Sequence, residues 1–144
     1  MAALDRYFRE LVTQDIRRRM TTCFVAVENH GHRVIGYYTL SSTGIPTTEL
    51  LQSIIRALPR YPTLPAIRIG RLAVNAVDHG HGIGSILLIG AAKRALRAEA
   101  AAFTLLVDAK DDHSSAFYRH HGFMALASQP RMLFLPLTTI AKIF

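Results

Sequence analysis

The residues best suited to chemistry in this chain are the glycines of one short loop, Gly80, Gly82 and Gly84. Glycine has no Cβ, so its backbone N–H group can come close to an anion. A helical pattern begins directly after the loop, and a helix start carries a partial positive charge of roughly half a unit. The loop therefore predicts a binding site for a phosphate or pyrophosphate group.

Two common nucleotide-binding loops do not fit. A P-loop requires Lys and then Ser or Thr after its last glycine, whereas Gly84 is followed by Ser85 and Ile86. A dinucleotide fingerprint requires a third glycine where this chain has Leu87, and it needs an acidic ribose partner about 20 residues later that is missing here. A glycine-rich turn alone fits a structural role equally well, so other residues must decide.

The segments around the loop indicate a strand before it and a helix after it. Residues 65–75 are apolar and β-prone, and residues 82–100 have apolar side chains at helical spacing. Residues 103–109 predict a buried strand, and a short helix is expected from residue 112 or 113 to residue 121, stopped by Gly122. The loop thus belongs to a unit of strand, helix, strand and helix.

The remaining segments predict a helix, a hairpin and several short elements. In order they are a helix at residues 4–20, strands at 22–28 and 33–41, a Ser-, Thr-, Gly- and Pro-rich loop at 41–48, a short helix at 49–58, a proline-containing loop up to Pro65, and short strands at 123–127 and 132–137.

Composition bounds the class of protein. With 144 residues, 50% of them hydrophobic, the chain predicts one domain over residues 1–144. Its single cysteine, Cys23, cannot form an internal disulfide, and no leader or long apolar run is evident, so we expect a cytoplasmic protein without membrane contact. The net charge of +7 favours nucleic acid or a phosphorylated ligand, although some basic chains bind neither.

Closely spaced histidines raise the question of a metal site. They occur as His30 and His32, His79 and His81, and His120 and His121. These pairs lack the i, i+4 helical spacing of metal ligands and have no accompanying cysteine or carboxylate set. The sequence therefore predicts no metal.

A second motif follows the glycine loop. Residues 116–118 read Ala-Phe-Tyr, and residues 121–123 read His-Gly-Phe. Together with the loop, this pattern resembles the GNAT family of acetyl-coenzyme A (acetyl-CoA) dependent N-acetyltransferases, over nearly the whole chain. Several local runs look like the subgroup that serves as toxins of bacterial toxin–antitoxin pairs; they are residues 4–8, 23–27, 36–40, 58–62, 70–74 and 107–111.

The resemblance implies a fold and an activity. The fold would be the α/β (α+β) GNAT fold, with a mixed, mostly antiparallel sheet flanked by helices. The family's usual first strand has no counterpart before the helix here, so the strand near Thr22 would be an exposed edge. The toxin subgroup acetylates the α-amino group of aminoacyl-tRNA and so blocks translation.

The resemblance also implies roles for particular residues. The pantetheine arm and thioester carbonyl of acetyl-CoA would meet backbone groups of Leu72, Ala73 and Val74. Tyr118 would be the general acid that protonates the departing thiolate. The pyrophosphate would be wrapped by His79, Gly80, His81, Gly82, Ile83, Gly84 and Ser85, and further coenzyme contacts fall at Asp111 and Phe117. A free α-amine has a pKa of about 7.7 to 8 and is therefore partly neutral at cytoplasmic pH, so its direct attack on the thioester needs no strong base.

Two residues depart from the family pattern. His79 stands where Arg or Gln is usual, and imidazole is fully charged only in mildly acid solution, so we expect weaker coenzyme binding that tightens as the pH falls. Asp111 stands where Asn is usual, and an ionised carboxylate cannot donate a hydrogen bond.

The resemblance implies partners and leaves alternatives open. A toxin of this subgroup would have a small ribbon-helix-helix antitoxin and would form a homodimer. The alternatives are an enzyme that acetylates a small amine or a protein N-terminus, and a weak remnant that only binds coenzyme or nucleic acid. The cations would form either an ordinary solvated surface or a tRNA-binding surface; they are Arg17, Arg18, Arg19, Arg56, Arg60, Arg68, Arg71, Lys93, Arg94 and Arg97.

Overall fold

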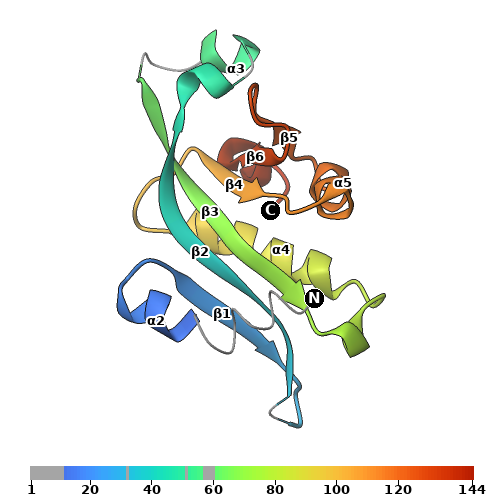
Figure 1. Ribbon diagram of the computed structural model, residues 1–144. Coiled ribbons are helices and arrows are strands. Elements are labelled where there is room, and N and C mark those ends of the chain that lie inside the picture. Colours follow the sequence, from blue (N-terminus) through green and yellow to red (C-terminus); the bar gives the residue numbers. More distant parts are fainter. Residues whose placement is uncertain (1–11, 32, 51, 57–60) are drawn as a thin grey trace. The chain divides into compact units, whose positions relative to one another are not determined.

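The computed structural model describes residues 12–31, 33–50, 52–56 and 61–144, drawn as coloured ribbon in Figure 1. The elements in chain order are α2 (Val12–Arg17), β1 (Thr22–Val27), β2 (Val34–Pro46), η2 (Thr47–Glu49), α3 (Gln52–Arg56), β3 (Thr63–Val74), η3 (Ala76–Asp78), α4 (Ile83–Arg97), β4 (Thr104–Asp108), α5 (Asp112–His120), β5 (Met124–Ala125), β6 (Met132–Pro136) and α6 (Leu137–Ala141). Apart from the 3-10 turns η2 and η3, the order of helices and strands up to β6 is the one that the sequence predicted.

The chain divides into two compact units. Unit 1 comprises Met1–Ser41 and Ile69–Arg94, and unit 2 comprises Ser42–Arg68 and Ala95–Phe144. Strands β2 and β3 and helix α4 continue from one unit into the other. The described strands form one sheet in the order β1-β2-β3-β4-β6-β5. Three neighbouring pairs, β1–β2, β4–β6 and β5–β6, are antiparallel, so the predicted mixed, mostly antiparallel fold class is correct.

Strand β1 lies at the end of this sheet. It pairs with β2 in a hairpin in which Phe24 faces Tyr38 and Val25 faces Tyr37. On its other edge no described strand is hydrogen-bonded to it, as expected for the strand near Thr22. The predicted absence of a family strand before the first helix lies outside the described residues, as does the start of the helix predicted at residues 4–20, of which α2 is the described part.

Strand β2 is longer than predicted. The sequence indicated a loop at residues 41–48, but β2 continues to Pro46. The reason is burial, because the side chain of Ile45 is only 1% exposed and belongs to the core of unit 2. Strand β3 likewise begins at Thr63, two residues before Pro65, and the carbonyl of Pro65 accepts the N–H of Phe103 at 2.8 Å. Pro65 lacks an N–H, but its carbonyl still joins the sheet.

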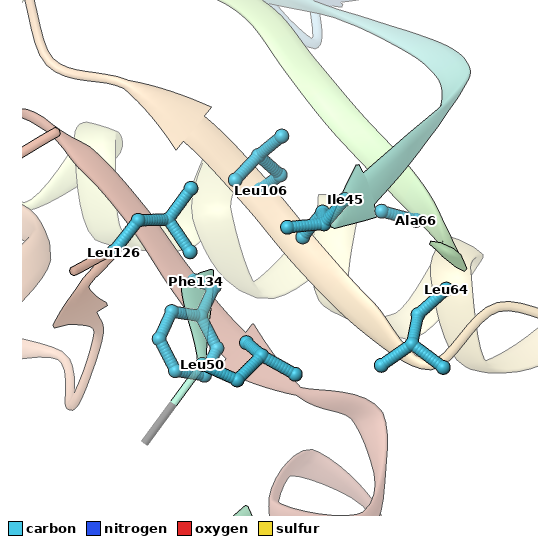
Figure 2. Packing of buried hydrophobic residues seen from close by; sticks show 7 residues of the cluster. All are labelled: Ile45, Leu50, Leu64, Ala66, Leu106, Leu126 and Phe134. Carbon is cyan, nitrogen blue, oxygen red and sulfur yellow. The ribbon is translucent and has the colours of Figure 1, made fainter. Parts of the chain in front are cut away.

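The core of unit 2 is a cluster of apolar side chains from strands and loops, shown in Figure 2. Its members are Ile45, Leu50, Leu64, Ala66, Leu106, Leu126 and Phe134. Phe134 is fully buried, as are the strand residues Leu105 and Leu133. This burial explains why β4 reads as a continuous apolar run. Helix α6 was not predicted from the sequence. Its apolar side chains Leu137 and Ile140 are buried.

None of the helices in the described part of the chain is long and apolar enough to cross a membrane.

Candidate functional site

In unit 1, the predicted coenzyme strand is held by close contacts with β2. The N–H of Arg71 donates to the buried hydroxyl of Thr39 at 2.9 Å. At Gly36 a Cβ atom would lie 2.6 Å from the carbonyl oxygen of Ala73 and 3.0 Å from Leu87. Such distances are too short for a side chain, so only glycine permits this approach. The position of Ala73, in the middle of the predicted pantetheine-binding segment, therefore depends on Gly36.

The end of β3 turns sharply into η3. Asn75 begins this turn: its side chain accepts from the N–H of Val77 at 3.4 Å, and its own N–H donates to the carbonyl of Ile35 at 2.7 Å. Its side-chain amide also donates to the carbonyl of Val34 at 3.3 Å. Asn75 thus ties the strand end to β2 through backbone and side chain, and it fixes where the glycine loop starts.

The glycine loop has the backbone that the sequence predicted. Gly80 has φ of 83° and Gly82 has φ of 73°, which is the left-handed region that favours glycine. A Cβ at either position would meet nothing within 4 Å, so glycine is required here by conformation and not by space. Helix α4 follows at Ile83 with no acidic residue in its first turn. The open loop and the helix start fit a pyrophosphate group.

His79, the residue expected at the head of the pyrophosphate site, is hydrogen-bonded within the loop. Its Nε2 lies 2.9 Å from the carbonyl oxygen of Val74. A carbonyl oxygen only accepts, so Nε2 carries the proton of the neutral ring. The other nitrogen, Nδ1, then has a lone pair and can donate to a phosphate only when the ring is doubly protonated. His79 therefore offers less to an anion than the sequence suggested.

Arg33 clamps the loop from the β1–β2 hairpin. Its guanidinium binds both carboxylate oxygens of Asp78, at 2.6 and 3.2 Å, and it also pairs with Glu28. Hydrogen bonding to Arg33 holds the pKa of the Asp78 carboxyl below its usual range, with smaller contributions from the charges of Arg33, His81 and His79. The sequence analysis missed this clamp, because nothing in the spacing of Arg33 and Asp78 connects them.

In unit 2, helix α5 carries the predicted general acid. Asp111 caps this helix, because its carboxylate accepts the N–H of Ser114 at 2.8 Å. Hydrogen bonding to the backbone and to the side chain of Ser114 lowers the pKa of the Asp111 carboxyl. The side chain that was expected to contact the coenzyme thus has a structural role, and its predicted contact stays a prediction.

Tyr118 is buried, with 6% of its surface exposed, and burial raises its pKa above the ordinary value. Its ring lies edge-on to Phe117 and to Phe123, at centroid distances of 5.1 and 5.4 Å. Gly122, with φ of 93°, ends the helix and turns Phe123 back onto Tyr118. Because burial raises its pKa, the phenol stays protonated at neutral pH and is able to donate.

Phe117 contacts a second ring besides Tyr118. It lies edge-on to His121 at 4.9 Å. Burial lowers the pKa of His121, and the charge of His120 lowers it further. The predicted site residues thus fall into two groups. Unit 1 holds Leu72, Ala73, Val74 and the loop His79–Ser85, and unit 2 holds Asp111, Phe117 and Tyr118.

Several of the basic residues considered for a nucleic-acid surface have local partners; the guanidinium of Arg71, for example, donates to the carbonyl of Gly70 at 2.9 Å. The guanidinium of Arg94 donates to the hydroxyl of Tyr38 at 2.8 Å and lies over the ring of Phe24 at 3.8 Å. Arg68 faces Asp108 at 3.9 Å. Arg60 lies outside the described residues. Arg17, Arg18 and Arg19 are exposed. Searching the described residues for groups of three or more His, Cys, Asp or Glu that could hold a metal ion finds none.

Comparison with known proteins identifies the family. Residues 19–125 match the family described as "Acetyltransferase (GNAT) domain". The chain belongs to this family and is an acetyl-CoA dependent N-acetyltransferase. It is 31% identical over 135 residues to a "tRNA-acetylating toxin" of Mycobacterium tuberculosis, covering 92% of this chain and 79% of that protein.

Solved structures point to the same subgroup. A mutant of KacT, with one tyrosine replaced by phenylalanine, is similar with a TM-score of 0.93 and 25% identity, over 100% of this chain and 87% of that one. AtaT complexed with acetyl-methionyl-tRNAfMet gives a TM-score of 0.92 and 25% identity, with the same coverage of 100% and 87%. The predicted resemblance to the GNAT toxins is confirmed.

Proposed function

We propose that this chain acetylates the α-amino group of aminoacyl-tRNA and thereby blocks translation. The observation that carries the proposal is its similarity, over 92% of its length, to a tRNA-acetylating toxin. The similarity to AtaT complexed with acetyl-methionyl-tRNAfMet supports the same substrate class. A net charge of +7 is suited to a polyanionic substrate.

Acetyl-CoA would be held mainly by unit 1. The loop from His79 to Ser85 would take the pyrophosphate, since Gly80 and Gly82 leave its backbone open. The strand residues Leu72–Val74 would meet the pantetheine arm with their backbone groups. Bound coenzyme supplies the activated acetyl group, and these residues orient it.

Tyr118 would act as the general acid. In the transfer, the C–N bond forms as the C–S bond breaks; the sulfur gains a proton and the amine loses one. A raised pKa keeps the phenol of Tyr118 protonated before the reaction. It also means that the phenol is a weaker acid than a thiol, whose pKa is about 8.5, so a free phenolate left beside the new thiol would be unfavourable. We therefore expect Tyr118 to pass its proton to sulfur while the proton that the amine releases restores the phenol.

Acetylation of charged tRNA tests the proposal directly. Purified protein is incubated with acetyl-CoA and charged tRNA, and N-acetyl-aminoacyl adenosine is measured by mass spectrometry after nuclease digestion. Tyr118→Phe should lower the rate by about 100-fold or more, as expected for loss of a general acid. Its coenzyme affinity should match the wild type, because the predicted coenzyme loop does not include Tyr118. Phe123→Leu, which keeps the phenol and alters a ring that packs edge-on against it, serves as a control for packing.

Other outcomes select the alternatives. Coenzyme turnover with a small amine or a peptide, and none with charged tRNA, would indicate a different acceptor. Coenzyme binding without any turnover would indicate a remnant. We also propose the cytoplasm as the site of action, a small ribbon-helix-helix antitoxin as partner and a homodimer as the assembly; size-exclusion chromatography with light scattering tests the last.

A further inference from the structure

Four consecutive residues around the start of β2 hold the segment that leads into the glycine loop. All of them, and the residues that they hold, belong to unit 1. The contacts are those of Gly36 with Ala73, of Ile35 and Val34 with Asn75, and of Arg33 with Asp78. The first three use the backbone of β2, whereas the contact nearest to the loop depends on the side chain of Arg33.

The guanidinium of Arg33 binds Asp78 through two nitrogens. Nη1 lies 2.6 Å from Oδ2 and Nη2 lies 3.2 Å from Oδ1, which is a bidentate arrangement. Nε donates to Glu28 in the same hairpin, so the planar group is held on two sides. A bidentate contact fixes the direction of both side chains as well as their distance. Asp78 is thereby held in one place relative to the hairpin.

The stability of the fold gives little reason for this contact. The side chain of Arg33 is 44% exposed, and ion pairs at such positions add little to the free energy of unfolding. The position of Asp78 is also unfavourable for an anion site, because its carboxylate precedes by one residue the loop that is expected to take a pyrophosphate. The pair of Arg33 and Asp78 is therefore better explained by what it does for the loop.

The charge of Asp78 acts on the loop. The lowered pKa of its carboxyl comes mainly from hydrogen bonding to Arg33, and the charges of His81 and His79 in the loop contribute as well. Coulomb interactions are mutual, so an unpaired Asp78 would repel a phosphate held by the same loop. The guanidinium of Arg33 places the opposite charge directly against that carboxylate.

We propose that Arg33 is a positioning residue for acetyl-CoA, which acts through Asp78 by holding the start of the glycine loop and by cancelling the charge of that carboxylate. Arg33 does this without touching the coenzyme. The inference rests on the proposed function, in which the loop from His79 to Ser85 takes the pyrophosphate. A loop that is held before the ligand arrives loses less conformational entropy on binding, so the affinity rises without a further contact.

A double-mutant cycle tests whether Arg33 acts through Asp78. Isothermal titration calorimetry measures the binding of acetyl-CoA to Arg33→Gln, to Asp78→Asn and to the variant that combines them. Arg33→Gln should raise the Kd about tenfold, because it loses the bidentate contact and leaves the carboxylate unpaired. The combined variant should bind more tightly than Arg33→Gln, since its two amides are neutral and can hydrogen-bond to each other. An unchanged Kd in Arg33→Gln, or additive losses in the combined variant, would overturn the proposal.

A direct contact between Arg33 and the coenzyme would give a different result. CoA carries a 3′-phosphate besides its pyrophosphate, and acetyl-dephospho-CoA lacks only the 3′-phosphate. If Arg33 acts on the loop, Arg33→Gln should weaken the binding of both coenzymes by the same factor. A loss that is confined to acetyl-CoA would contradict the proposal and would indicate that Arg33 binds the 3′-phosphate.

Matched controls separate positioning from charge and from folding. Glu28→Gln changes the other partner of Arg33 and should keep the affinity for acetyl-CoA, because Asp78 retains both of its contacts. Lys142→Gln removes one exposed positive charge from unit 2 and should also keep it. Without coenzyme, Arg33→Gln should melt close to the wild type. If it melts well below the wild type and the combined variant regains no affinity, Arg33 serves the fold and the proposal fails.

Gly82→Ala distinguishes this inference from the proposed place of the pyrophosphate. Gly82 has φ of 73°, so a side chain there strains the loop itself. If Gly82→Ala weakens the binding of acetyl-CoA and Arg33→Gln does not, the role of Arg33 fails alone. If neither substitution changes the affinity, the loop does not hold the pyrophosphate and both fail. These measurements need no acceptor, so they decide the role of Arg33 even if charged tRNA is not the substrate.

Discussion

The hydrogen bond of His79 limits what its ring offers to an anion. Nε2 donates to the carbonyl of Val74, which leaves Nδ1 without a proton in the neutral ring. The residue would thus assist pyrophosphate binding only after it gains a second proton. This geometry gives a structural reason for the pH dependence that the sequence suggested.

We predict that His79→Arg tightens acetyl-CoA binding at pH 7.5 by about tenfold, because arginine adds a permanently charged donor. Isothermal titration calorimetry measures the change. His30→Arg adds the same charge in the exposed hairpin turn and should have little effect. Equal affinities for His79→Arg and the wild type would show that the loop does not use this position.

The Arg33 clamp remains formed at neutral pH. The pKa of Asp78 is lowered in the folded protein, so the clamp is present above the ordinary carboxyl range and is lost only as the pH falls through the lowered pKa.

At the scale of elements, helix α5 depends on its cap. Asp111 accepts from the N–H of Ser114, and its lowered pKa means that the stabilisation is complete above the unfolded pKa of about 3.9. It is lost as the pH falls through the folded pKa. Asp111→Ala should therefore melt at a lower temperature than wild type at pH 7, with a difference that shrinks once the pH falls below the ordinary carboxyl range. Asp111→Asn, which can still accept, should lose less.

Strand β3 depends on the absence of a side chain at Gly36. Adding a Cβ there would push on the carbonyl of Ala73, which is backbone and cannot rotate away. We expect Gly36→Ala to weaken acetyl-CoA binding and to lower the melting temperature. Gly31→Ala is the control, because its added Cβ would meet only the flexible side chain of Glu28, at 3.3 Å. Unchanged binding in Gly36→Ala would mean that the strand end tolerates displacement.

The sequence predicted elements whose local pattern agrees with their burial. Strand β4, helix α4 and the left-handed glycines Gly80 and Gly82 are of this kind. The sequence prediction was wrong for the end of β2. The Ser, Thr, Gly and Pro composition there indicates a loop, but Ile45 is buried in a core whose other members come from segments far away in the sequence. The sequence also did not predict the hydrogen bond between Asn75 and Val34 or the ion pair between Arg33 and Asp78. The partners of the first are 41 positions apart in the chain and those of the second are 45 positions apart.

At the scale of the whole molecule, charge should govern the encounter with tRNA. The rate constant kcat/KM for charged tRNA should fall steeply as the salt concentration rises. In a plot of log(kcat/KM) against log[salt], each contact with a single-strand phosphate should add roughly −0.7 to the slope. The kcat/KM for a small amine should change little. Reversing the charges of Arg17, Arg18 and Arg19 to Glu should flatten the slope. Lys142→Glu reverses an exposed cation of unit 2 and is the control. Unaltered acetylation of tRNA by the triple variant would exclude this cluster from the binding surface.

The burial of the tyrosines has a spectroscopic consequence. The chain contains no tryptophan, so its near-ultraviolet circular dichroism arises largely from five tyrosines. Tyr37 and Tyr38 are buried in unit 1 and Tyr118 in unit 2. Difference spectra between wild type and either Tyr38→Phe or Tyr118→Phe thus give each unit its own optical signal. If both signals disappear in one transition on heating, the two units unfold as a single cooperative domain.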